Sequence, residues 1–239
     1  MSGGSLTIRP VSGSKRDERS FIDFPKRLYR ESERYVPLFD MDMRALLRKC
    51  HPFFRHSGGE FLLVERGGEV AARCLITDNT RYNEFHKTNF AFFDYFDIVE
   101  DQAVADELFA HLESWARERG RTALVGPMLS GGANGAGILV DGFDLDPAMT
   151  MMRYNYPYYP HLLEEAGFEK YVDLHSFAIP PERFILSERI ARLAENVLAR
   201  GRFSVLRFRN KREIREVVED VKVLYAKTAL DLEEIPKTL

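Results

Sequence analysis

The chain has 239 residues and 45% of them are apolar, which is enough to bury the core of one large domain or of one domain and part of a second. Its 34 basic and 37 acidic residues leave a formal net charge of −3, so the overall charge argues against nucleic acid and against anionic lipid as partners. No apolar run approaches the roughly 20 residues that span a bilayer, and the first residues lack the apolar stretch of a signal peptide. We therefore expect a cytoplasmic protein with no membrane partner.

The first residues predict a strand followed by two helices. Residues 6–11 have the alternation of a strand, and residues 15–31 carry aromatic side chains and leucine at helical spacing. Pro25 should kink or divide this helix, because a proline lacks the backbone donor that a helix interior uses. A second, shorter helix is expected over residues 41–49.

A β-hairpin follows. Residues 60–66 and 69–78 predict two strands joined by the two-residue turn Gly67-Gly68. Residues 89–99 are aromatic and alternating, which predicts a third strand beside the pair.

The most regular helical pattern covers residues 101–120, where Asp101 can cap the start and Gly120 ends the helix. Its apolar face consists of Val104, Ala105, Leu108, Phe109, Leu112, Trp115 and Ala116. Such a stripe must lie on a sheet. Residues 122–128 form a short apolar run, so strand, helix and strand here predict a parallel crossover.

The stretch 126–144 is rich in glycine but contains neither common phosphate-binding motif. A Walker loop needs Gly-x4-Gly-Lys-Ser/Thr, whereas Gly126 and Gly131 are followed by Gly132 and Ala133. A dinucleotide fingerprint opens a helix, whereas this stretch leads into ILVDGFD, which is typical of strand and turn. We expect an irregular crossing between two elements.

A helix over residues 157–166 and a strand over residues 171–179 complete the first domain, which we place at residues 1–180. The remaining residues, 181–239, follow Pro180-Pro181 and predict a helix, a strand and a helix.

In this tail, the helices are expected over residues 187–200 and from Lys211, with Asn210 and Glu213 as a capping pair, and the strand over residues 203–208. SVLRFR followed by KR echoes LTIRPV followed by KR at the beginning of the chain, which predicts the start of a second, truncated domain of the same kind. So short a segment must pack on the first domain, pair with another chain as in a homodimer, or be completed by a missing C-terminal domain.

The order of elements is similar to the fold of the GNAT acyltransferases. FIDFPKRLYR, RYNEFH, GPM, GILVDGFD and YNYPYYPHLLEEAGFEKYVDL resemble a bacterial branch of the GNAT superfamily whose members carry two GNAT-like halves in tandem. The resemblance covers about residues 21–179. It implies an α/β (α+β) fold with a GNAT-like mixed sheet, a central antiparallel hairpin, splayed fourth and fifth strands and flanking helices.

The resemblance also implies acyl transfer from acetyl-CoA or another acyl-CoA to an amine. No metal is expected, because the six histidines show no His-x3-His or comparable spacing. In such enzymes the pantetheine arm lies between the splayed strands and the pyrophosphate lies at the start of the following helix. The residues that would contact the donor are Phe96, Ile98, Val99, Gly126 and Asn155. The sequence departs from the family at the phosphate site, where Asp97, Glu100 and Asp101 would repel a pyrophosphate.

A second departure concerns catalysis. The family places an acid tyrosine four residues before the Gly-Phe that ends the last helix, and here that position is Leu163. Tyr158 or Tyr159 could substitute. Glu84 and His86, expected in a loop, could act as the base toward the amine or could be solvated surface residues.

Two functions therefore stay open. The chain is either a GNAT-like N-acyltransferase domain, active or degenerate, or a non-catalytic module that binds a small amine or acyl ligand or another protein on the same fold. The tyrosines at 154, 156, 158 and 159 beside Asn155 fit both, because they could line a pocket or pack under a loop.

Overall fold

The computed structural model describes residues 5–128, 136–147, 152–177, 182, 185–201 and 205–231. The chain divides into two compact units, Met1–Lys170 and Tyr171–Leu239. The boundary that we expected at residue 180 lies outside the described residues.

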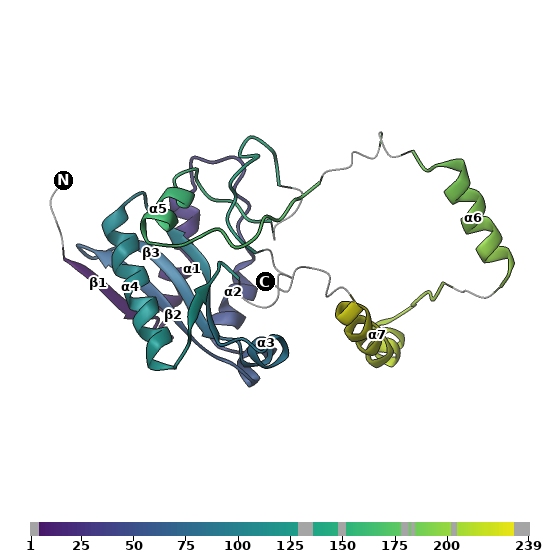
Figure 1. Cartoon of the computed structure of the whole chain (residues 1–239), viewed down its shortest axis with the longest axis horizontal. Coiled ribbons are helices and arrows are strands. Elements are labelled where there is room, and N and C mark those ends of the chain that lie inside the picture. Colours follow the sequence, from purple (N-terminus) through teal and green to yellow (C-terminus); the bar gives the residue numbers. More distant parts are fainter. Residues whose placement is uncertain are drawn as a thin grey trace. The chain divides into compact units, whose positions relative to one another are not determined.

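The first unit is built on a five-stranded mixed sheet (Figure 1). The strands pair in chain order, antiparallel except for the last pair. They are β1 Leu6–Pro10, β2 Gly58–Arg66, β3 Glu69–Asp78, β4 Phe90–Ile98 and β5 Ala123–Val125. The expected hairpin is β2–β3, and its turn needs glycine because Gly67 and Gly68 have φ of 58° and 87°. This is the GNAT-like arrangement that the sequence predicted.

Helices cover both faces of the sheet (Figure 1). One face packs against α1 Lys15–Leu28, α2 Asp40–Leu47 and the short 3-10 helix η1 Pro52–Arg55. The other face packs against α4 Gln102–Glu118 and α5 Tyr159–Glu165. Alternate residues of β2 account for the two layers, since Phe61 and Leu63 join the first core and Leu62 and Val64 the second.

The strands β4 and β5 pair over a short length only. Their parallel register begins at Phe90 with Ala123 and ends at Phe92 with Val125. The helix α4 makes the crossover between them, as expected, but β5 has three residues where we expected seven. Beyond this point Gly126 lies so close to β4 that an added Cβ would be 2.5 Å from the Phe93 carbonyl oxygen. The Met128 N–H also donates to this oxygen at 2.7 Å, so backbone contact on this side of β4 reaches Phe93, and the unpaired part of β4 lies beyond it.

The second unit contains the helices α6 Glu188–Ala199 and α7 Lys211–Asp231. The capping pair of α7 is present, because Asn210 accepts from the Glu213 amide at 3.2 Å and Glu213 accepts from the Arg209 amide at 2.8 Å. The two expected strands are wrong where the structure describes them, since residues 171–177 and 205–208 are not in a strand. A strand needs a neighbouring strand to supply its hydrogen bonds, and among the described residues the sheet consists of β1 to β5 without these segments.

Candidate functional site

The loop expected to hold Glu84 and His86 is the helix α3 Thr80–His86. Asn79 caps it by accepting a hydrogen bond from the Tyr82 amide at 3.1 Å, and this asparagine was the sequence signal that our interpretation missed. Both Glu84 and His86 are exposed, and the His86 ring lies 4.2 Å from the Tyr82 ring.

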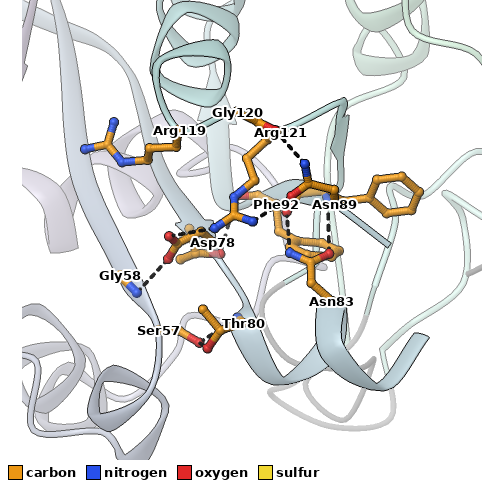
Figure 2. Close-up of polar contacts among 12 residues, drawn as sticks. Ser57, Gly58, Asp78, Thr80, Asn83, Asn89, Phe92, Arg119, Gly120 and Arg121 are labelled. Carbon is orange, nitrogen blue, oxygen red and sulfur yellow. Dashed lines mark hydrogen bonds and ion pairs between the residues drawn. The ribbon is translucent and has the colours of Figure 1, made fainter. Parts of the chain in front are cut away.

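A polar cluster next to α3 holds the starts of β4 and β5 together (Figure 2). Figure 2 shows the Arg121 guanidinium between Asp78 and Asn89, at 3.3 and 2.7 Å. The Asn83 amide accepts from the Phe90 N–H and donates to its carbonyl, both at 2.9 Å. Because these contacts fix the paired end, the strands can part only toward their carboxyl ends.

At the unpaired end, two tyrosines from the start of α5 bond to both backbone groups of Ile98 in β4. The Ile98 N–H donates to the Tyr159 hydroxyl at 3.0 Å, and the Tyr158 hydroxyl donates to the Ile98 carbonyl at 2.6 Å. The two backbone groups of Ile98 that a neighbouring strand would have paired are thus satisfied by side chains of the same chain.

A buried polar chain continues behind these tyrosines. The Tyr159 and Tyr29 hydroxyls lie 2.5 Å apart, and Tyr29 donates to Asp97 at 3.0 Å. Asp97 in turn accepts from the Arg73 guanidinium at 2.7 Å. These groups come from β3, β4, α5 and the residue that ends α1, Tyr29, so the chain links four elements around the gap.

Arg73 also explains how α1 tolerates a proline. A residue at position 25 would normally donate to the Phe21 carbonyl, but Pro25 has no N–H. The Arg73 guanidinium donates to this carbonyl instead, at 2.7 Å, and lies 4.8 Å from the Phe21 ring. Pro25 therefore lies inside α1 without dividing it, contrary to one of our two expectations.

Burial keeps the tyrosines protonated at neutral pH. It raises the pKa of Tyr159 far above its usual value, and the Asp97 charge raises it further. The pKa of Tyr158 is raised mainly by burial and then by the Glu100 carboxylate. Both phenols can therefore donate hydrogen bonds but are poor bases.

A second ion pair lies nearby on β4. Arg153 approaches Asp94 at 2.5 Å, and the adjacent Tyr95 has a left-handed φ of 47° beside the register shift between β3 and β4. Burial raises the pKa of Tyr95 to about 12.

The acidic rim expected at the start of α4 is largely neutralised. Asp97 is buried with Arg73, and Asp101 pairs with Arg66, whose second guanidinium nitrogen lies 3.0 Å from the carboxylate. This contact lowers the pKa of Asp101. Asp101 also caps α4 by accepting from the Val104 amide. The expectation of three repelling carboxylates is therefore wrong, because two of the three are paired with arginines.

The remaining residues expected to contact a donor have structural contacts. Asn155 is 4% exposed, and its amide accepts from Leu139 N–H at 2.7 Å and donates to the Leu139 carbonyl at 3.0 Å. Phe96 lies in the core, and the Val99 N–H donates to the Ala71 carbonyl at 3.0 Å. The glycine-rich residues 129–135 lie outside the described residues, and the following 136–147 contain no helix or strand.

The structure brings Tyr158, Tyr159 and Ile98 together but not the proposed base. The helix α3 is bonded to Phe90 and the tyrosines are bonded to Ile98, at opposite ends of β4. Eight residue steps along a strand separate these points by roughly 25 Å. Glu84 and His86 therefore do not share a centre with the tyrosines.

No protein-family model matches the chain. Two curated relatives are Protein YghO of Escherichia coli, 24% identical over 184 residues, and a bacterial ceramide synthase of Caulobacter vibrioides, 32% identical over 174 residues. These alignments cover 77% and 72% of this chain but 47% and 45% of the relatives. The chain thus spans about half the length of both.

Solved structures with similarity include a tandem GNAT protein from the clavulanic acid biosynthesis pathway, with 17% identity, a TM-score of 0.46 and coverage of 68% of this chain and 43% of that one. Another is a ribosomal-protein-alanine N-acetyltransferase from Brucella melitensis, with 16% identity, a TM-score of 0.43 and coverage of 74% and 99%.

Within the described ranges, the structure contains no helix long and apolar enough to cross a membrane. The same residues contain no group of three or more histidine, cysteine, aspartate or glutamate side chains arranged to hold a metal ion.

Proposed function

We propose that the chain is a GNAT-like half of a longer N-acyltransferase, and that the gap beyond the β4–β5 pairing receives the arm of an acyl-CoA. The observation that supports this most is at Ile98, whose backbone N–H and carbonyl both bond to hydroxyl groups rather than to a strand. A pantetheine arm carries amide groups with one acceptor and one donor each. Two such amides, one accepting from the Ile98 N–H and the other donating to the Ile98 carbonyl, could replace the two hydroxyls.

The name of one relative suggests the kind of substrate. A ceramide is the amide of a fatty acid and a long-chain amino alcohol, and a bacterial ceramide synthase is 32% identical to this chain over 174 residues. By analogy, we propose a long-chain acyl-CoA as the donor and a long-chain amine as the acceptor. Because the chain spans about half of that relative, the acceptor site would be shared with a second half.

The chemistry assigns a role to Tyr158. The amine nitrogen attacks the thioester carbonyl, a C–N bond forms, the C–S bond breaks, and the thiolate takes a proton. Tyr158 is half-buried, protonated and bonded at the gap. Because its pKa is raised it is a weak acid, so we assign it the donation of a hydrogen bond to the sulfur as the thiolate forms. Glu84 and His86 are too far away to take the proton of the amine, so we expect the base to come from elsewhere in the full protein.

The hydrogen bonds of the Ile98 backbone also favour a second function, that of a non-catalytic module. The hydroxyls of Tyr158 and Tyr159 already satisfy Ile98, so a protein that had lost its donor would need no change to keep this end of the sheet stable. The chain would then be a binding or assembly module on a GNAT-like fold.

Thermal unfolding with and without acyl-CoA separates the two functions. A ligand at 100 times its dissociation constant adds about 2.7 kcal/mol to the free energy of unfolding, which raises Tm by roughly 5–10 °C in a chain of this size. We expect this shift with palmitoyl-CoA, kept below its micelle concentration, and a smaller shift with acetyl-CoA. No shift with either, when free palmitate also gives none, would favour the non-catalytic module.

A further inference from the structure

The outer face of α1 carries four exposed cations close together. Lys15, Arg16, Arg19 and Arg27 are exposed and line an open surface hollow together with Ser20 and Asp23. Within the described part of the chain, none of these four cations forms an ion pair.

The cations are unpaired because the acidic residues of α1 are bound to other groups. Asp17 bonds to Arg9 at 3.0 Å, and Glu18 bonds to Arg48 at 3.0 Å. Asp23 bonds to Lys26 at 3.2 Å. A chain with a formal net charge of −3 therefore has a local positive surface, which the overall balance of charge conceals.

Two exposed apolar side chains adjoin this positive surface. Lys26 bonds to Asp23 on α1 and, at 2.6 Å, to Asp40 at the start of α2. Asp40 is flanked in sequence by Phe39 and Met41, which are 64% and 75% exposed. One lysine thus connects the cationic hollow to an aromatic ring and a thioether that face water.

We propose that this surface, which we call the α1–α2 basic surface, binds peripherally to an anionic phospholipid bilayer. It consists of Lys15, Arg16, Arg19, Arg27, Phe39 and Met41.

The two parts of this surface match the two layers of a membrane interface. Arginine and lysine pair with lipid phosphates, while Phe39 and Met41 enter the region beneath the headgroups. A nucleic acid would engage the cations but leave both apolar side chains in water. The proposal is independent of acyl transfer, and it needs no helix that crosses the bilayer. It replaces our expectation, based on the net charge alone, that the chain has no anionic lipid as a partner.

Flotation of the full chain with vesicles tests this proposal. We expect binding to vesicles of 30% phosphatidylglycerol in phosphatidylcholine, weaker binding to phosphatidylcholine alone, and release as salt rises from 50 to 500 mM. Each basic side chain near such a surface contributes about a fivefold gain in partitioning, so the double variant Arg16→Gln/Arg19→Gln should bind about 25-fold more weakly. Phe39→Ser should weaken the binding that remains at high salt.

The matched control removes the same charge from the opposite face of the sheet. Arg117→Gln/Arg119→Gln, at the C-terminal end of α4, should bind as the wild type does, and thermal unfolding should show that each variant is folded. Equal binding to the charged and the neutral vesicles, equal loss in both double variants, or preference for a DNA duplex over the vesicles would each overturn the proposal.

Discussion

Replacing Asp97 with asparagine tests the buried chain behind the β4–β5 gap. The substitution keeps the shape of the side chain and an oxygen that can accept from Tyr29, but it removes the charge that faces Arg73. The Arg73 side chain is 5% exposed, so water cannot take the place of the carboxylate. Removing one partner of a buried ion pair typically costs about 3–5 kcal/mol.

This cost is large enough to measure by calorimetry. For a chain of 150–250 residues each kcal/mol lowers Tm by about 2–4 °C, so Asp97→Asn should lower Tm by at least about 6 °C. The matched control is Glu113→Gln, which breaks the pair between Glu113 and Arg117, whose side chains are 42% and 73% exposed. Exposed pairs contribute under about 1 kcal/mol, so the control should change Tm by a few degrees at most.

A double-mutant cycle separates the ion pair from other effects. Arg73→Met alone leaves both Asp97 and the Phe21 carbonyl without their partner, whereas Arg73→Met/Asp97→Asn leaves no buried charge. We expect the double variant to be more stable than the sum of the single losses predicts, by about 2 kcal/mol or more. Additive losses, or a loss from Asp97→Asn no larger than that of the control, would refute the account of a coupled buried chain.

Three further predictions concern packing, pH and ligand binding. In a denaturant titration, Gly126→Ala should lower the free energy of unfolding by about 2–3 kcal/mol, because a Cβ would lie 2.5 Å from the Phe93 oxygen. The comparison is Gly13→Ala, which should lose about 1 kcal/mol, because Gly13 has open space around it but a left-handed φ of 76°. Hydrogen bonds from Ser12, and then the contact with Arg9, lower the pKa of Asp17 to about 2. Asp17 should therefore add about 2 kcal/mol to the free energy of unfolding above pH 4, and this contribution is lost as the pH falls toward 2. An Asp17→Asn variant that kept the same slope of stability against pH would contradict this. Tyr158→Phe should bind palmitoyl-CoA a few-fold more tightly in calorimetric titration, because the hydrogen bond from Tyr158 to the Ile98 carbonyl no longer competes with the ligand. In the full protein the turnover of this variant should fall. Unchanged affinity with unchanged turnover would exclude Tyr158 from both donor binding and catalysis.

Local patterns in the sequence account for most of the first unit. The Gly67-Gly68 turn between two alternating runs allowed the hairpin to be predicted, and the helix between two apolar runs allowed the parallel crossover to be predicted. The helix α3 could also have been predicted, since Asn79 directly before Thr80 is a typical N-cap, but we interpreted the segment as a loop. Each of these signals lies within a few residues of the element that it specifies.

The site could be predicted only in part, because its contacts join residues far apart in the chain. The tyrosines at 158 and 159 were noticed as a cluster, but Tyr29 lies 130 residues before Tyr159 and contacts it directly. Nothing beside Pro25 indicates that Arg73 replaces its missing donor across the fold. The charge of Asp97 was judged without its partner for the same reason, which is why the acidic rim was overestimated.

In the second unit, a sequence pattern predicted strands that the structure does not contain in the residues it describes. Residues 171–177 and 205–208 have the alternation of strands, but alternation specifies a strand only where a sheet edge is available to pair with it. The exposed side chains of α6, among them Ile190 and Leu193, show that its apolar face is uncovered in the described residues.

The Ile98 amide gives the most direct test of the proposed donor site. In 1H–15N spectra of the isotope-labelled chain, saturating palmitoyl-CoA should shift the Ile98 resonance and change its rate of hydrogen exchange, because the donor replaces the Tyr159 hydroxyl as its partner. Palmitoyl-CoA that binds while the Ile98 amide keeps its position and its exchange rate would contradict the account.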